Sequence, residues 1–240
     1  MRRGTRLAMS CGALAVVLAA CASVENAHAE RLRYTQEFLF AQCGGFSSEG
    51  SHPYWVLEPG FEAVLEGKEG GADVRVVITV TDEVEFVDGV ETRVVIEAES
   101  EDGETVEISR NFFAICNRDN SVVYFGEDVD NYKNGVVDNH DGSWRAGVNG
   151  ARAGVIMPGT LLVGAKYFQE IARDDKALDR AEIVSMDVEF QTPAGTFSNC
   201  LRTRESSPLE PGKVQVKHYA PGIGLIQDAK LKLVSATTLR

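Results

Sequence analysis

Apolar and polar residues alternate along two stretches of the chain, Val90–Ala98 and Glu104–Ile115, and this period of two is typical of β-strands. In each stretch one set of alternate positions is apolar, and the other set is mostly Glu, Arg, Ser or Asn. We expect the apolar set to face inward and to line one continuous apolar surface, with the polar set facing water. The residues assigned to this surface are Val94, Ile96, Val106, Ile108 and Phe112.

Similar signals over most of the chain predict roughly ten strands separated by turns. Pairs such as Asp88-Gly89 and Asp102-Gly103 supply the positive φ angles of tight hairpins. With little helical periodicity, the chain must form a sandwich or curl its sheet, and we expect a mainly β fold, a single antiparallel meander curled into a half-barrel or barrel-like sheet. The expected strands are Asp73–Phe86, Val90–Ala98, Glu104–Ile115, Ser121–Phe125, Lys166–Ala172, Ala181–Gln191, Thr196–Glu205, Lys213–Tyr219, Gly224–Gln227 and Lys230–Ser235.

The N-terminus has the composition of an export signal. An arginine-rich leader at residues 2–6 precedes the apolar run Leu14–Ala20, which is too short for a stable membrane span. The run ends in Ala20-Cys21 and resembles the bacterial lipobox, so we expect cleavage before Cys21 and fatty acylation of its thiol. A competing small-x-small site at residues 27–29 would instead release a soluble protein.

These features predict a signal peptide over residues 1–20, a lipidated N-terminus and flexible tether over residues 21–50, and one antiparallel β domain over residues 51–240. The last segment is long enough for one sizeable core. A chain anchored in this way would lie in the bacterial cell envelope, on the outer membrane facing the periplasm in a Gram-negative cell.

The charge balance limits the partners. The chain has 24 Lys and Arg against 36 Asp and Glu, a formal net charge of −12. Such a surface is repelled by nucleic acid phosphates and by anionic lipid headgroups. We therefore expect no nucleic acid partner, and contact with the membrane only through the lipid anchor.

Three cysteines follow Cys21, an odd number for an oxidising compartment. We expect Cys43 and Cys116 to lie at loop edges, where two Cβ atoms most easily reach bonding distance, and Cys200 to lie in a strand. We favour a disulfide between Cys43 and Cys116 and a buried free thiol at Cys200. No C-x-x-C spacing indicates a redox dithiol or a zinc site.

The acidic run from Glu127 through Asp128 to Asp130 is the cluster best suited to a cation, because its hard oxygen ligands would fit calcium. The spacing is not that of an EF-hand, and the alternative is that these acids face solvent at a hairpin end. His140 and Ser143 lie nearby in sequence without a hydrolase motif around them. We therefore expect no cofactor, with calcium at Glu127, Asp128 and Asp130 as the alternative.

Several aromatic residues either belong to the core or line an apolar pocket. They are Trp55, Phe61, Trp144, Tyr167 and Phe168.

The motifs at residues 124–130 (YFGEDVD), 192–197 (TPAGTF) and 219–225 (YAPGIGL) resemble those of a family of uncharacterised exported bacterial β-proteins and lipoproteins. The resemblance runs from about residue 53 to residue 234. The ending is similar to that of the periplasmic half-barrels in the broad group of lipoprotein-localisation factors, which curl one sheet around an apolar cavity. The resemblance implies such a fold and brings no catalytic residue.

We expect, on these grounds, a non-enzymatic envelope lipoprotein that binds an apolar ligand, such as a small molecule, or another envelope protein. Two alternatives remain open. One is a calcium-binding or hydrolytic module built on residues 127–141, and the other is a purely structural envelope protein.

Overall fold

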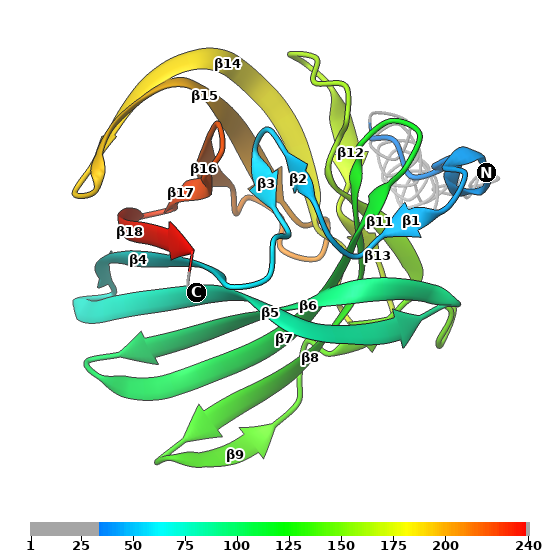
Figure 1. Cartoon of the computed structure of the whole chain (residues 1–240). Coiled ribbons are helices and arrows are strands. Elements are labelled where there is room, and N and C mark those ends of the chain that lie inside the picture. Colours follow the sequence, from blue (N-terminus) through cyan, green and yellow to red (C-terminus); the bar gives the residue numbers. More distant parts are fainter. Residues whose placement is uncertain (1–33, 239–240) are drawn as a thin grey trace, which may run out of the picture. The chain divides into compact units, whose positions relative to one another are not determined.

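The computed structural model describes residues 34–238. The chain divides into two units, Met1–Thr35 and Gln36–Arg240, and only the second is considered below. It is built almost entirely from antiparallel β-structure, with 64% of residues in strands, and a path of 13 strands curls until it is nearly closed (Figure 1). The expected fold class, mainly β with a barrel-like sheet, is confirmed.

The first half of the sheet is a meander of five long strands. They are β4 (Phe61–Glu69), β5 (Ala72–Val87), β6 (Val90–Glu101), β7 (Glu104–Cys116) and β8 (Val122–Lys133). The turns between β5, β6 and β7 use Asp88-Gly89 and Asp102-Gly103, all four at positive φ. The Asx-Gly signals therefore identified these two hairpins correctly.

The second half is another meander, which pairs with the first at its end. It comprises β14 (Arg180–Thr192), β15 (Gly195–Ser206), β16 (Gln215–Ala220), β17 (Gly224–Asp228) and β18 (Leu231–Thr238). Strand β18 lies antiparallel to β4, with Leu233 opposite Leu65. In Figure 1 β14 and β15 arch over one side and β4 to β8 form the other.

A short segment between the meanders brings the ends of the sheet together. Strand β12 (Lys166–Phe168) pairs with β14, and β13 (Glu170–Ile171) pairs with β11 (Arg152–Met157), which itself pairs with β8. Only the buried Gln169 separates β12 from β13, the two ends of the path. Gly154 makes this approach possible, because a Cβ there would lie 2.3 Å from the Gln169 carbonyl oxygen. The small strands β9 (Val136–Asn139) and β10 (Trp144–Arg145) pair with the far part of β8.

The ordered fold begins before residue 51, where the expected tether was to end. Residues of that segment form a 3-10 turn, Phe40–Gln42, and strand β1 (Phe46–Ser47), which pairs with β7. Strands β2 (Ser51–His52) and β3 (Trp55–Val56) then form a hairpin that lies between the two sides of the sheet (Figure 1). The boundary of the compact unit is Gln36.

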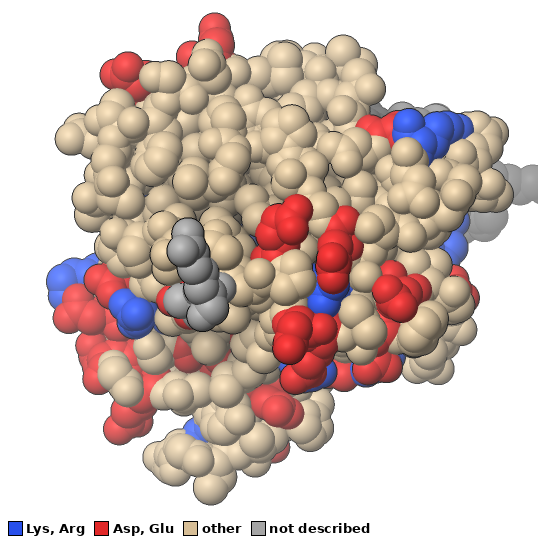
Figure 2. Space-filling view, viewed as in Figure 1, with Lys and Arg blue, Asp and Glu red and all other residues tan. Residues whose placement is uncertain are grey.

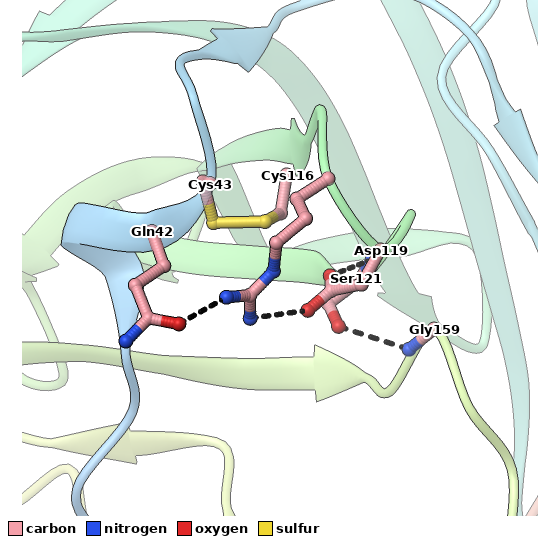
Figure 3. Close-up of a disulfide and its surroundings, with 7 residues drawn as sticks. Gln42, Cys43, Cys116, Asp119, Ser121 and Gly159 are labelled. Atoms are coloured by element: carbon pink, nitrogen blue, oxygen red, sulfur yellow. Dashed lines mark hydrogen bonds and ion pairs between the residues drawn. A yellow bond between two sulfur atoms is a disulfide. The ribbon is translucent and has the colours of Figure 1, made fainter.

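Two features attach this N-terminal segment to the sheet. The first is a disulfide between Cys43 and Cys116, the pair that the sequence favoured, at a sequence separation of 73 (Figure 3). Beside it the Arg118 guanidinium bonds to Gln42 and, at 3.2 Å, to Asp119. The nearby loop is held by a bond from the Gly159 N–H to the Ser121 hydroxyl, at 2.9 Å.

The second feature is Arg93, a fully buried arginine in β6. Its guanidinium donates to the Ser48 carbonyl at 3.0 Å and to the Glu49 carboxylate at 2.7 Å. It also reaches the Thr81 and Glu83 carbonyls at 3.5 and 3.3 Å, where the pairing of β5 with β6 shifts register. Arg93 thus satisfies polar groups of two irregular segments at once.

Candidate ligand-binding pocket

A pocket of about 50 Å³ lies on the inner side of the sheet, where β4 to β6 meet β3 and the start of β17. The register aligns Ala63, Ile78 and Glu97 across β4, β5 and β6, so their side chains share one face. Apart from Glu97, the lining is apolar or glycine. The lining residues are Trp55, Val56, Phe61, Ala63, Ile78, Val80, Val95, Glu97, Ile223, Gly224 and Leu225.

Two of the five aromatic residues singled out in the sequence, Trp55 and Phe61, line this pocket. The other three, Trp144, Tyr167 and Phe168, are buried elsewhere in the unit. The Trp55 ring lies 5.1 Å from Phe113 and 6.3 Å from Tyr219. Trp55 therefore connects the pocket to the aromatic part of the core.

Glu97 is the ionisable group in the lining. Its carboxyl forms no hydrogen bond or ion pair with any residue in the range 34–238. Its pKa is raised to about 7, chiefly by burial; Lys217 opposes the rise, and Asp228, Glu107 and Glu99 add to it. At neutral pH the group thus lies near the midpoint of its titration.

Lys217 is already engaged by other acids. Its ammonium group lies 3.2 Å from a carboxylate oxygen of Glu205 and 3.2 Å from one of Asp228. The Tyr219 hydroxyl donates to Glu205 at 3.1 Å. Two buried polar atoms beside this network have no partner among the described residues, the Tyr167 hydroxyl and the second carboxylate oxygen of Asp228.

A second polar group lies on the same face of the sheet, around β7 and β8. The Tyr124 hydroxyl donates to the Asn111 side-chain carbonyl at 2.6 Å, and Glu127 faces Asn111 across the strand pair. Burial raises the pKa of Glu127 to about 8, against the opposing effect of its hydrogen bond with Tyr124. Burial likewise raises the pKa of Glu170 well above its usual range. The inner side of the sheet therefore holds several carboxyl groups that favour the protonated state.

The expected apolar surface faces the other way. Opposite partners in the sheet share a face, and Val94 lies opposite Phe112, Ile96 opposite Arg110, and Ala98 opposite Ile108. Val95 and Glu97, which alternate with that set, line the pocket instead. The face carrying Val94, Ile96, Ile108 and Phe112 is the outer one, and Val106 lies at a register shift.

A neighbouring arginine contributes to the burial of Phe112 on this outer face. The Arg145 guanidinium lies 4.6 Å from the centre of the Phe112 ring. Arg145 is held there by Asp128 at 2.5 and 3.0 Å and by Glu85 at 3.1 Å. A salt-bridged arginine thus covers the aromatic ring from outside, as a long side chain with an apolar stem can do.

The three acids considered for calcium are not brought together. Glu127 lies on the inner face of β8, whereas Asp128 and Asp130 point to the outer face. Asp128 is paired with Arg145, and Asp130 lies 2.8 Å from the His140 ring. In the described part of the chain, no group of three or more His, Cys, Asp or Glu side chains could hold a metal ion.

The residues considered for hydrolysis bind the backbone of β8. The Ser143 hydroxyl accepts the Val129 N–H at 2.8 Å, and the His140 ring lies 2.9 Å from the Val129 carbonyl oxygen. His52 is buried in the N-terminal hairpin, which lowers its pKa to about 4. These positions give the histidine and serine side chains structural partners in the fold.

The remaining thiol, Cys200, is free and buried. Its sulfur lies 3.4 Å from the Phe197 carbonyl oxygen, and burial raises its pKa. A buried, protonated thiol is a poor nucleophile.

Cys21 and the rest of the predicted signal and lipidation site lie outside the described residues. Within residues 34–238 no helical segment has the length and apolarity needed to cross a bilayer. No family model matches the chain, and no curated protein or solved structure is similar to it at a significant level.

Sequence reasoning missed Glu97 as a site residue. The sequence did indicate that Glu97 could face inward. Val95 and Glu97 alternate with Val94 and Ile96, and each of the two sets contains a branched apolar residue. The pattern of β6 therefore fits either face. The choice depends on what covers the other side, here Arg145 over Phe112.

Proposed function

We propose that this protein is a non-enzymatic lipoprotein of the bacterial cell envelope that binds a small apolar ligand inside its curled sheet. The lipid on Cys21 would tether the sheet domain to the membrane, on the periplasmic side. Binding of an envelope protein is the alternative for the same domain.

The observation that supports ligand binding is the pocket at Trp55. Apart from Glu97 its walls are apolar or glycine and come from five strands and a turn, and such convergent concave sites are where small ligands bind. The volume of about 50 Å³ exceeds that of a single water. It suits the end of an alkyl chain or a comparably small group.

Ligand binding can be measured through tryptophan fluorescence, because the chain has two tryptophans and only Trp55 lines the pocket. The variant Trp144→Phe leaves Trp55 as the single reporter. We expect short alkyl alcohols to change its emission in a saturable way. In this background Val56→Phe, which fills the pocket, should abolish the change.

The matched control is Val214→Phe. Val214 is 49% exposed and does not line the pocket, so this variant should respond as the parent does. Equal responses in all three proteins, or none in any, would rule out this pocket as the ligand site.

The anchor is tested separately by Cys21→Ser. We expect this change to abolish incorporation of labelled fatty acid and to move the protein from the membrane fraction to the soluble one. Equal retention of both forms on the membrane would contradict the lipoprotein assignment and would leave the pocket untouched.

A further inference from the structure

The pocket combines apolar walls with a carboxyl group that has no partner. Burying a carboxylate costs free energy unless an opposite charge or hydrogen-bond donors compensate it. Within residues 34–238 the Glu97 carboxyl forms no hydrogen bond or ion pair, and Lys217, the cation that lowers its pKa, is paired with Glu205 and Asp228. The free oxygens of Glu97 are therefore available to a ligand.

The charges around Glu97 determine whether a cationic or an anionic ligand is favoured. Among the described residues, the charges that act most strongly on Glu97 are one cation, Lys217, and three acids, Asp228, Glu107 and Glu99. Lys217 already lies within 3.2 Å of Glu205 and of Asp228. A carboxylate ligand would thus meet uncompensated negative charge, and a cationic one would be attracted.

The aromatic wall adds to this preference. A cation over the face of a tryptophan ring is attracted by the negative charge of its π-system, most strongly where water is excluded. Trp55 belongs to the same lining as Glu97. The Tyr167 hydroxyl and one oxygen of Asp228 are buried and have no hydrogen-bond partner among the described residues, which indicates further unused polar capacity near the acidic network.

The exterior does not share this arrangement. Arg110 is paired there with Glu83 at 2.7 Å, and Arg145 with Asp128 and Glu85. Figure 2 shows that acidic and basic side chains are interspersed over β4 to β8, whereas the face over β14 and β15 is largely uncharged. The unpaired acid in an apolar setting is a feature of the inner side.

We propose that the pocket binds an organic amine, with its alkyl part against the apolar walls and its ammonium group held by Glu97 beside Trp55. This inference rests on the function proposed above and names the chemical class of the ligand. The pocket volume of about 50 Å³ limits the inserted alkyl part to a few carbon atoms.

A chain-matched series tests the proposal: n-butylamine, n-butanol and n-butyrate share one alkyl chain and differ in charge. Binding is followed by Trp55 fluorescence in the full chain carrying Trp144→Phe, at pH 8, where Glu97 is ionised and the amine is protonated. We expect butylamine to bind about tenfold or more tightly than butanol, as an added charge-assisted contact predicts, and butyrate to bind most weakly.

Glu97→Gln keeps the shape of the side chain and removes its charge. It should lower butylamine affinity about tenfold, to the level of butanol, while butanol affinity stays unchanged and shows that the pocket is intact. Glu127→Gln, a carboxyl on the same face that does not line the pocket, should leave the preference for the amine as it is.

The outcomes are distinct. If butanol binds as tightly as butylamine, or if Glu97→Gln weakens both equally, the amine proposal fails and the apolar pocket remains. If butyrate binds most tightly, the sign of the charge argument is wrong. If none of the three binds, the proposed function fails together with this inference.

Discussion

Replacing Arg93 with methionine tests whether one buried side chain holds the N-terminal segment onto the sheet. Arg93 is 2% exposed, and its guanidinium is hydrogen-bonded to the Ser48 carbonyl and the Glu49 carboxylate, with longer contacts to Thr81 and Glu83. Methionine has a similar length and fills much of the same space. The change therefore removes the hydrogen bonds and the charge with little loss of volume.

The expected cost follows from the contacts. Hydrogen bonds to a charged group contribute about 1.5–3 kcal/mol each, and the two short ones dominate here. Relief of the buried charge offsets part of the loss, because a buried ion carries a desolvation penalty. Glu49 is 61% exposed, so water solvates its released carboxylate. We expect Arg93→Met to lower the free energy of unfolding by about 3 kcal/mol, or about 6–12 °C in Tm for a domain of this size.

The assay is urea unfolding followed by circular dichroism, with Arg110→Met as the control. Arg110 lies on the neighbouring strand and pairs with the same Glu83 that Arg93 contacts through its carbonyl, but its side chain is 39% exposed. An exposed pair of this kind contributes at most about 1 kcal/mol. Equal losses in the two variants would refute the role assigned to Arg93.

Three further predictions concern closure, the disulfide and the inner carboxyl groups. Gly154→Ala should destabilise the fold by about 3 kcal/mol or prevent folding, because its Cβ would overlap the Gln169 carbonyl, and wild-type stability in thermal unfolding would contradict the closure. Reducing the Cys43–Cys116 bond should cost about 2–5 kcal/mol, measured as unfolding with and without reductant, and no shift would argue against the 73-residue loop. Glu127 should lower stability by about 1–2 kcal/mol from pH 6.5 to pH 8, because it stays protonated in the folded state up to its pKa of about 8 while the unfolded chain has already lost this proton; Glu97, with a pKa of about 7, adds to the fall. Glu127→Gln should flatten this decline, and an unchanged slope would show that Glu127 is not its source.

The predicted fall in stability is measured above pH 6.5 because His52 has the opposite effect on stability at lower pH. Its pKa is lowered in the folded state, so between about pH 4 and 6.5 the unfolded chain binds the extra proton and stability rises with pH. Glu127 has the opposite sign over the same range, since its pKa is raised. His218, whose pKa is also lowered by burial, acts in the same direction as His52; above about pH 7.5 both are neutral in either state, and the buried carboxyl groups then dominate the slope.

Local sequence signals predicted most of the long strands because they depend on adjacent residues. They missed β4 and β11, and the single strand expected at Lys166–Ala172 is divided into β12 and β13, which pair with different strands. The turn pairs at Asp88 and Asp102 fixed the hairpins of β5, β6 and β7, and the expected strand ends differ from those seen by a few residues. The strand expected to end at Phe125 instead continues to Lys133 as β8. Its acidic half was considered as a loop or hairpin end, but each acid there has its own partner or a buried position.

Closure and the identity of the inner face depend on contacts between distant residues. The approach of Gly154 to Gln169 joins segments that no periodicity relates. The inner face of β6 could not be chosen from its own pattern either, because Val94 and Val95 are both buried, one on each side. The deciding contact is that of Arg145 with Phe112, between residues on different strands.

Several charged side chains on the outer face of the sheet are paired, whereas Glu97 on the inner face is not, and this difference indicates a functional role for Glu97. Outside, Arg110 and Arg145 pair with carboxylates that remain near solvent, an arrangement with little cost. Inside, Glu97 lines an apolar pocket without a partner, and an alkyl side chain there would serve the stability of the sheet better. Carboxyl groups held in unfavourable surroundings with raised pKa values are concentrated at functional sites in proteins. An ammonium group bound to Glu97 would offset part of this penalty, so the proposed ligand should stabilise the fold when it binds.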